Sequence, residues 1–418
     1  MTLAIVIFGA ALALIATERV HRTKVAMIGG VLVLLTQTID QERAIESVDF
    51  NTLGLLAGMM LVVRLTEATG IYNYLAIRAG QIARGRPFLV VLSLGLTTAV
   101  LSAFLDNLTT VLLMVPITFL LADTLDIDPI PLVLIEILVS NIGGTATLIG
   151  DPPNIMIAGA TGLSFGEFVV NLAPLAAFTF VVVIGVLYLA FRRRLQIAPE
   201  ARDRVMDLDA GKSIEDRAEL RRTGPILILT ILAFFVHKQL HLEPATVALG
   251  GASIMLLVTT QSVEKALSGI EWSTLFFFLG LFVMVGALEE TGAIQEIADG
   301  IASATDGNRS AELLGIAWVS AFASGVVDNI PFTATMIPVV DQLQGGENGD
   351  DAYWWVLAIG ACFGGNATLI AAAANVAAAG MAQRAGRPIA FLEFLRVGLP
   401  ITVLSMLIAT AYIALRYL

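Results

Sequence analysis

Apolar runs close to membrane-spanning length recur from one end of the chain to the other, for example at 3–16, 25–39 and 223–236. A transmembrane helix needs about 20 mostly apolar residues, so the runs predict an all-α polytopic membrane protein. Composition strengthens this prediction. Of the 418 residues, 57% are hydrophobic and 14% are charged, whereas soluble domains carry about 25% charged residues. These values exclude a soluble enzyme, a disordered protein and a disulfide scaffold.

The two halves of the chain repeat each other. The strongest matches share polar and glycine residues: Asp106-Asn107 with Asp328-Asn329 at an offset of 222 residues, and GGTATLI at 143–149 with GGNATLI at 364–370 at an offset of 221. Apolar bias alone would match leucines and valines, but not aspartates, asparagines and glycines in one register. We therefore predict three segments: a first repeat at 1–191, a cytoplasmic linker at 192–222 and a second repeat at 223–418.

Each repeat is predicted to contain a helical hairpin and a discontinuous helix besides ordinary spans. The hairpins are expected at about 88–122 and 311–344, and the broken helices at about 131–160 and 353–384. If each hairpin enters and leaves the membrane on one side, about five crossings per repeat remain. Because five is odd, the second repeat is inverted relative to the first. The fold then has about ten crossings plus two re-entrant hairpins.

The charged loops indicate the orientation. With the N-terminus outside, most of the 24 lysine and arginine residues lie in segments predicted to be cytoplasmic, as the positive-inside rule requires. We therefore expect a multi-pass protein of the inner (plasma) membrane with both termini on the outer face. The linker at 192–222 is then a solvated connector or, alternatively, a regulatory or docking element.

Each hairpin carries an Asp-Asn pair between two apolar arms. A charge at the centre of a span costs about 2.5–3.5 kcal/mol on insertion scales. Asp106 and Asp328 therefore indicate cation binding, proton coupling or repair of a broken backbone. Because the repeats are inverted, the two pairs should face each other near the midplane. Capping of the hairpin arms is the alternative role. The pattern predicts no lysine or arginine at this depth.

The segments after the hairpins break helical geometry. Gly143-Gly144 lets the backbone leave the helix, and Pro152-Pro153 cannot continue its hydrogen-bond ladder. Unwound backbone at membrane depth is tolerated where it lines protein or a water-filled cavity. Freed carbonyls and threonine hydroxyls could there bind a small cation or a hydroxylated solute, and a packing kink is the alternative. The first repeat also has Asp151, an extra carboxylate that favours a cation or proton site in that half.

These patterns predict one substrate- and ion-binding site drawn from both repeats. Its expected members are Asp106, Asn107, Thr109, Thr110, Asn141, Gly143, Gly144, Thr145, Thr147, Asp151 and Asn154 in the first repeat, and Asp328, Asn329, Thr333, Gly364, Gly365, Asn366, Thr368 and Asn375 in the second. Cys362 precedes the second glycine pair. It is either a soft ligand for a thiophilic solute such as trivalent arsenic or a small apolar filler.

Several other kinds of chemistry are not expected. The net charge of −11 argues against nucleic-acid binding, which needs clustered cations. The three histidines flank apolar segments, so we predict no metal site. No nucleophile is paired with a base, so we predict no catalytic residue, no enzyme activity and no cofactor. A channel is the alternative from a different functional class.

The motifs resemble those of the ion transporter superfamily, and more closely its CitMHS-like permeases, ArsB arsenite pumps, NhaD sodium/proton antiporters and melanosomal P protein. The resemblance rests on LDNLTTVLLMVPI, SNIGGTATLIGDPPNIMIAGA, VVDNIPFTATMIPV and GGNATLIAAAANVAAAGMA. It implies a homodimer with a static scaffold and a mobile transport domain, which carries the site across the membrane as an elevator. It also implies that the hairpin tips and broken helices bind substrate and coupling ion. Carboxylate-transporting relatives have Ser-Asn-Thr at both tips. Here aspartate replaces that serine, which favours proton-coupled exchange.

We therefore expect a secondary active transporter in the lipid bilayer that handles a small inorganic solute or ion. The leading prediction is a proton-coupled antiporter that exports arsenite or antimonite as the neutral hydroxide, with Asp106 and Asp328 as proton carriers. Exchange of Na⁺ or Li⁺ for H⁺ is the alternative, and sodium-coupled anion or carboxylate uptake comes third. Some arsenite pumps of this kind associate with a soluble ATPase, although no docking site for one can be identified in this sequence.

Overall fold

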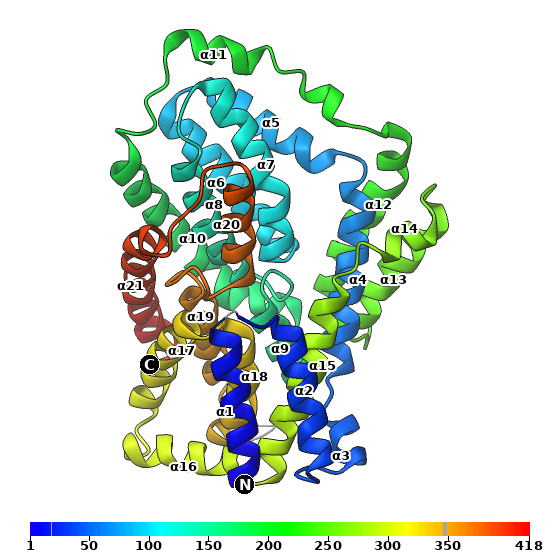
Figure 1. Cartoon of the computed structure of the whole chain (residues 1–418), viewed down its shortest axis with the longest axis vertical. Helices are drawn as coiled ribbons and strands as arrows, with labels where there is room; N and C mark the ends of the chain where they lie inside the picture. Colours follow the sequence, from blue (N-terminus) through cyan, green and yellow to red (C-terminus); the bar gives the residue numbers. More distant parts are fainter. Residues whose placement is uncertain (18, 346–348) are drawn as a thin grey trace.

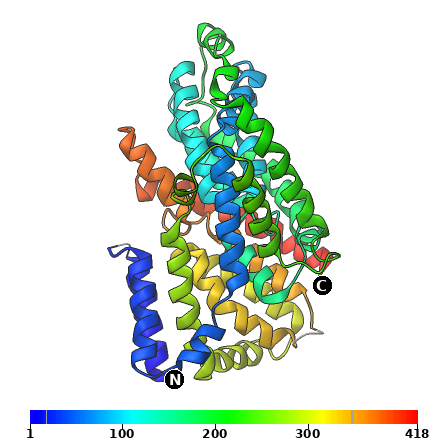
Figure 2. The same ribbon diagram turned by 90° about the vertical axis from the view of Figure 1, so that its right-hand side faces the viewer.

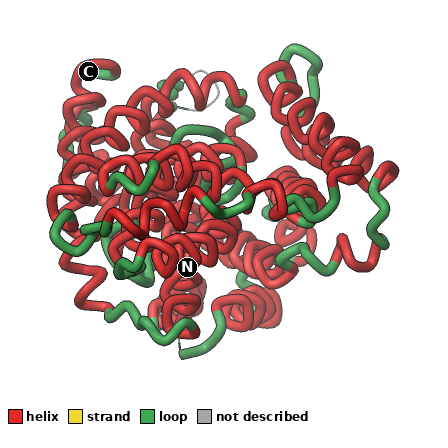
Figure 3. The backbone as a smooth tube through the Cα atoms, turned by 90° about the horizontal axis from the view of Figure 1, so that it is seen from above, coloured by secondary structure: helices red, strands yellow, loops and turns green. Residues whose placement is uncertain are grey.

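The computed structural model describes residues 1–17, 19–345 and 349–418, and within them every regular element is a helix (Figures 1 and 3). The first repeat contains α1 (Thr2–Ala16), α2 (Arg22–Leu35), α3 (Gln41–Glu46), α4 (Phe50–Glu67), α5 (Ile71–Ala83), α6 (Pro87–Phe104), α7 (Asn107–Leu125), α8 (Ile130–Gly144), α9 (Pro152–Thr161) and α10 (Phe165–Phe191). The linker contains α11 (Pro199–Met206) and the 3₁₀ turn η1 (Ala210–Ser213). The second repeat contains α12 (Arg217–Val236), α13 (Pro244–Val258), α14 (Val263–Leu267), α15 (Trp272–Glu290), α16 (Ala293–Ala304), α17 (Arg309–Val326), α18 (Asn329–Gln344), α19 (Ala352–Gly364), α20 (Ala373–Arg384) and α21 (Phe391–Arg416).

Many of these helices are apolar enough for a bilayer. Within the described ranges, six helical segments have the length and hydropathy of a membrane span: Gln41–Glu67, α6, α7, α10, α15 and α21. Four shorter apolar helices accompany them: α1, α8, α13 and α19. The predicted fold class, an all-helical multi-pass membrane protein, is confirmed.

The two helical hairpins enter the molecule from opposite ends. α6 and α7 are joined at Asp106, and α17 and α18 are joined at Asp328. Figure 1 shows the first hairpin and α8 in the upper half and the second hairpin and α19 in the lower half. Each Asp-Asn tip therefore points toward the middle of the molecule, as an inverted repeat requires.

Both repeats contain a helix that is interrupted after its glycine pair. α8 ends at Gly144 and the chain resumes as α9 at Pro152, whereas α19 ends at Gly364 and resumes as α20 at Ala373. Pro152 and Pro153 occupy the first turn of α9. Proline is tolerated there because the N–H groups of a first turn have no hydrogen-bond acceptor within the helix. Each interruption lies beside its own hairpin, because α6 packs on α8 and α17 packs on α19.

Small residues bring helices of the two repeats into close contact. α2 packs against α15, and α13 packs against α4, so each pair joins one helix from each repeat. A Cβ atom added to Gly30 would stand 3.2 Å from the carbonyl oxygen of Gly280. One added to Gly58 would stand 2.7 Å from the carbonyl carbon of Ala248. Backbones this close leave no room for side chains, and the two repeats therefore share an interleaved core.

The linker lies against the first repeat, at the top of Figures 1 and 2. α11 contacts α5 and α7, and its Ala201 and Val205 are buried. The side-chain amide of Gln81 on α5 donates a hydrogen bond to the carbonyl oxygen of Leu208 at 2.6 Å. The linker is therefore packed along part of its length rather than fully solvated, because its apolar residues pack against α5 and α7.

Candidate functional site

The two hairpin-tip aspartates cap the helices that follow them. Asp106 accepts hydrogen bonds from the backbone N–H of Thr109 at 2.8 Å and from the Thr109 hydroxyl. Asp328 accepts one from the backbone N–H of Ile330 at 2.9 Å. The capping role is therefore real at both tips. It does not account for the charge, because serine or asparagine would cap as well.

An arginine that the sequence pattern placed among the flanking cytoplasmic cations lies beside one tip. Arg22, the first residue of α2, has its Nη1 atom 3.2 Å from Oδ2 of Asp328. Its guanidinium also lies 5.1 Å from the centre of the Phe277 ring. The expectation that no lysine or arginine lies at the depth of the tips is wrong, because the fold places Arg22, at the start of α2, beside the tip of the second hairpin.

A chain of buried asparagines joins the two repeats. Asn107 donates to Oδ1 of Asn141 at 3.0 Å. Asn141 in turn donates to Oδ1 of Asn366 at 2.9 Å and to Oδ1 of Asn375 at 3.1 Å. The carbonyl oxygen of Leu138 accepts from Asn366 at 3.1 Å. The structure thus brings predicted residues from one hairpin tip and both helix interruptions into a single cluster.

The unwound backbone is held by equivalent asparagines in the two repeats. Asn154 donates to the carbonyls of Thr145 at 3.1 Å and Thr147 at 2.8 Å. Asn375 donates to those of Gly365 at 2.7 Å and Thr368 at 2.9 Å. Carbonyls that sequence reasoning treated as free ligands are therefore already bonded within the protein.

Most of the predicted threonine and glycine positions build the site rather than line it. The hydroxyls of Thr147 and Thr368 bond the carbonyls of Ala103 and Gly325, at equivalent places in the two hairpins. The hydroxyls of Thr145 and Thr333 bond carbonyls of their own helices, whereas Thr110 has a buried hydroxyl without a partner. Gly143, Gly144 and Gly364 allow close backbone approach, and Gly365 has the side chain of Ala372 as its neighbour.

Asp151 is fully buried between the repeats. Its Oδ1 accepts from the side chain of Asn329 at 3.2 Å, while its Oδ2 has no hydrogen-bond partner. The thiol of Cys362 lies next to it and 3.5 Å from Oδ1 of Asn154. Cys362 occupies the position equivalent to Asn141, so its thiol takes the place of an amide donor in the second repeat.

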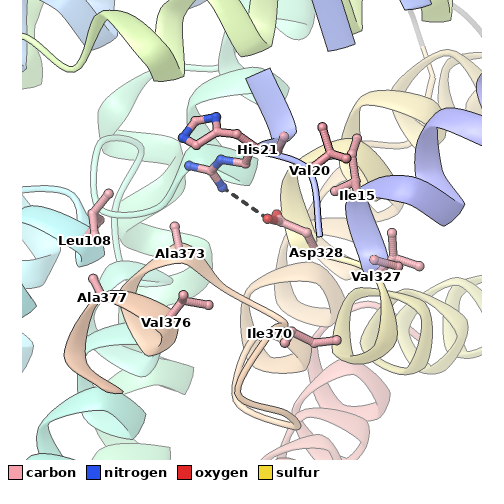
Figure 4. A pocket seen from close by; sticks show the side chains of 12 residues that line it. Ile15, Val20, His21, Leu108, Val327, Asp328, Ile370, Ala373, Val376 and Ala377 are labelled. Atoms are coloured by element: carbon pink, nitrogen blue, oxygen red, sulfur yellow. Dashed lines mark hydrogen bonds and ion pairs between the residues drawn. The ribbon is translucent and has the colours of Figure 1, made fainter. Parts of the chain in front are cut away.

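Two cavities border the hairpin tips. One, of about 370 Å³, is lined by Asp328, Arg22 and His21 together with apolar residues of α1 and α20. Figure 4 shows Asp328 at its wall, joined to the guanidinium, with Leu108 of the other tip across the opening. A second cavity, of about 20 Å³, lies between Arg22, Asp106 and Asn329. Arg22 is thus the cation shared by both cavities.

The described residues contain no group of three or more histidine, cysteine, aspartate or glutamate side chains suited to a metal ion. They do contain a fully buried carboxyl that sequence reasoning missed, Glu136 of α8. The sequence did contain a signal for it, because Glu136 is the single charged residue of a helix that is otherwise apolar up to Ser140.

Comparisons with known proteins identify the relatives of this chain. A family model described as a citrate transporter, CitMHS, matches residues 12–360. An uncharacterized transporter of Mycobacterium tuberculosis is 44% identical over 99% of this chain and 98% of its own length. The P protein of Homo sapiens is 32% identical over 100% of this chain, which spans 60% of that protein. The YdaH transporter of Alcanivorax borkumensis, whose structure is described as having an unusual topology, matches 95% of this chain and 98% of its own, with a TM-score of 0.64 at 14% identity.

Proposed function

Because the chain belongs to the CitMHS citrate transporter family of the ion transporter superfamily, we propose that it is a proton-coupled antiporter that exports arsenite or antimonite. The coarser statement, that it is a membrane transporter, follows from the family. The proposed cargo is the neutral trihydroxide. It is small and uncharged, and it offers hydroxyls that both donate and accept hydrogen bonds.

One observation carries the proposal: the asparagine chain that runs from Asn107 through Asn141 to Asn366 and Asn375. Amides present donors and acceptors to a hydroxylated solute without requiring charge. The chain also joins both repeats, so a solute held there would contact the tip of the first hairpin and both helix interruptions. The carboxylates at the two tips, Asp106 and Asp328, would then bind and release protons in exchange for movement of the cargo.

The proposed cycle uses the carboxylates in alternation. With cargo absent, protons enter from the outer side and neutralise the tips, and the transport unit moves as an elevator within each protomer of a homodimer. Loss of those protons to the cytoplasm readies the site for the next cargo molecule. Protonation of Asp328 would weaken its ion pair with Arg22, which links proton binding to movement of the second hairpin.

A second candidate function is coupled uptake of a small organic carboxylate. It is favoured by Arg22, which supplies a cation on a mainly apolar cavity of about 370 Å³. A carboxylate would compete with Asp328 for the guanidinium. Exchange of Na⁺ or Li⁺ for H⁺ draws its support from Asp151, a buried carboxylate with one oxygen unpartnered.

Flux into liposomes separates these functions. The purified protein is reconstituted with an imposed pH gradient, and lumenal pH is followed as arsenite, antimonite, Na⁺, Li⁺ or citrate is added. We expect arsenite and antimonite to evoke proton movement against a matched control of Asp106→Asn liposomes. A response to Na⁺ or Li⁺ alone, or to citrate alone, would replace the proposed cargo. Cargo movement only down its own gradient would indicate a channel.

A further inference from the structure

The first repeat holds a buried carboxyl group that the hairpin tips do not use. Glu136 of α8 is fully buried and accepts one hydrogen bond, from the Thr118 hydroxyl of α7. Its Oε2 atom has no hydrogen-bond partner. Among the described residues no lysine, arginine or histidine forms an ion pair with it. An ionised carboxylate in such surroundings is costly, whereas the protonated acid is not.

The second repeat shows that this polar pair is not needed to build the helix pair. α18 and α19 pack together as α7 and α8 do. The positions equivalent to Thr118 and Glu136 are Val340 and Leu357, both buried. The same architecture therefore forms with two apolar side chains. A structural requirement does not explain why the first repeat keeps a carboxyl group.

The Glu136 pair lies on the same helix contact as the asparagine cluster. Thr118 follows Asn107 by eleven residues, about three helical turns, so both side chains lie on one face of α7. Each bonds a residue of α8, Glu136 in one case and Asn141 in the other. Thr110, whose buried hydroxyl has no partner, lies between them along α7. A shift of α7 against α8 would therefore reach both the cargo cluster and Glu136.

Few titratable groups lie on the elements packed against α8. α6 has none within its bounds. The others are Asp106 at the cap of α7 and Asp123 within it, Glu167 and Tyr188 on α10, Tyr353 and Cys362 on α19, and Arg384 on α20. None of them makes a described hydrogen bond or ion pair with Glu136. The proton occupancy of Glu136 is therefore set by its access to water and by the Thr118 hydroxyl.

We infer that Glu136 is a third proton-binding site of the transport cycle, separate from Asp106 and Asp328. An O–H bond forms at Oε2 when the acid is closed off between α7 and α8, and the proton returns to water when that contact opens. This inference rests on the proposed proton coupling. It assigns to the first repeat a proton that the second repeat, with Leu357, cannot carry.

Infrared difference spectroscopy tests the site directly. Wild type and Glu136→Gln are reconstituted in lipid and compared across pH steps and on addition of arsenite or Na⁺. The glutamine still accepts from Thr118 but cannot bind the proton. We expect a carboxylic-acid C=O band that changes in wild type and is missing from the variant. Identical difference spectra in the two proteins would overturn the inference.

Transport provides the second measurement. We expect Glu136→Gln to lower pH-driven flux by about tenfold or more and to reduce the protons moved per cargo, while cargo exchange without a pH gradient continues. Unchanged flux with an unchanged proton count would overturn the inference. The double variant Glu136→Leu/Thr118→Val copies the second repeat and should fold, so it replaces Glu136→Gln if that protein aggregates. If wild type responds to no added solute, the proposed function fails, and the infrared comparison alone decides the role of Glu136.

Discussion

Asn141 bonds three other asparagines, because a side-chain amide both donates and accepts. Its oxygen accepts from Asn107, and its nitrogen donates to Asn366 and Asn375. The equivalent residue, Cys362, has only a thiol, a weak donor, which lies 3.5 Å from Oδ1 of Asn154. The repeats are therefore alike in backbone and unlike in chemistry, with the stronger polar connection in the first.

The variant Asp106→Asn separates helix capping from proton coupling. Asparagine is as good a helix cap as aspartate, so we expect the free energy of unfolding to change by less than about 1 kcal/mol. Proton-coupled flux in liposomes should nevertheless be lost, because an amide cannot carry a proton in exchange. Thermal unfolding in detergent and the liposome assay together check this. An unfolded or aggregated variant would show that the tip is chiefly structural.

The ion pair between Arg22 and Asp328 is expected to stabilise the fold. Arg22→Gln leaves the carboxylate without its cation, and we expect a loss of about 1–3 kcal/mol of stability, reduced by the partial exposure of the arginine. In an Asp328→Asn background the same change should cost much less. A double-mutant cycle on thermal unfolding measures the difference. Strict additivity of the two changes would mean that the pair does not interact.

Sequence reasoning predicted the four asparagines as site residues because they stand within repeated motifs, but it did not predict their hydrogen bonds to one another. It could not identify Arg22 or Glu136 as part of the functional region. Arg22 stands between two apolar runs, which is the usual place of a loop cation, and only the folded arrangement brings its guanidinium to Asp328. Glu136 corresponds to Leu357 in the second repeat, so a search for polar residues shared by the two halves could not find it.

At the scale of helices, glycines set how closely the hairpins approach the interrupted helices. A Cβ atom on Gly364 of α19 would stand 2.9 Å from Cα of Ala321 on α17. Gly143 of α8 is placed in the same way against Ala99 of α6. These are equivalent positions in the two repeats, so close packing here belongs to the architecture. In this structure these glycines therefore serve close helix packing, which is the alternative role expected for them from the sequence.

We predict that Gly364→Ala forces α17 and α19 apart and lowers the free energy of unfolding by about 1–3 kcal/mol. Gly315→Ala is a matched control on α17, because nothing lies within 4 Å of the added atom. That variant should be neutral or stabilised by up to about 1 kcal/mol. Thermal unfolding of the two purified proteins compares them. Equal stability would show that the helices adjust freely to a methyl group.

Element boundaries were accessible from sequence where local chemistry marks them. The Asp-Asn pairs mark the hairpin tips, the Gly143-Gly144 pair marks the end of α8, and the Pro152-Pro153 pair marks the start of α9. The packing of the linker on α5 was not accessible, because α11 is short and mostly polar. Its burial depends on a surface formed by helices that lie far from it in sequence.

For the molecule as a whole, the inverted arrangement fixes which ends belong together. The linker lies at the end of the molecule that carries α5, and α16 lies at the opposite end near the N-terminus (Figure 1). The positive-inside rule predicts that the linker end is cytoplasmic. We therefore expect α16 to face the outside.

The chain makes this orientation easy to test, because its single cysteine, Cys362, is buried. An introduced cysteine at exposed Ser303 of α16 should react with a membrane-impermeant maleimide in whole cells. One at Lys212 of the linker, whose side chain is 84% exposed, should react only after the cells are permeabilised. The reverse pattern would invert the assigned orientation.

The interleaved core also governs how the protein is made. α2 and α4 complete their packing only with α15 and α13, which begin 237 residues after α2 ends and 177 residues after α4 ends. At ordinary rates of elongation the ribosome needs on the order of ten seconds to a minute to reach them. During that interval the close glycine faces of the nascent first half have no partner. The insertion machinery or the surrounding lipid must cover them, and a chain that terminates early leaves them open to quality-control proteases.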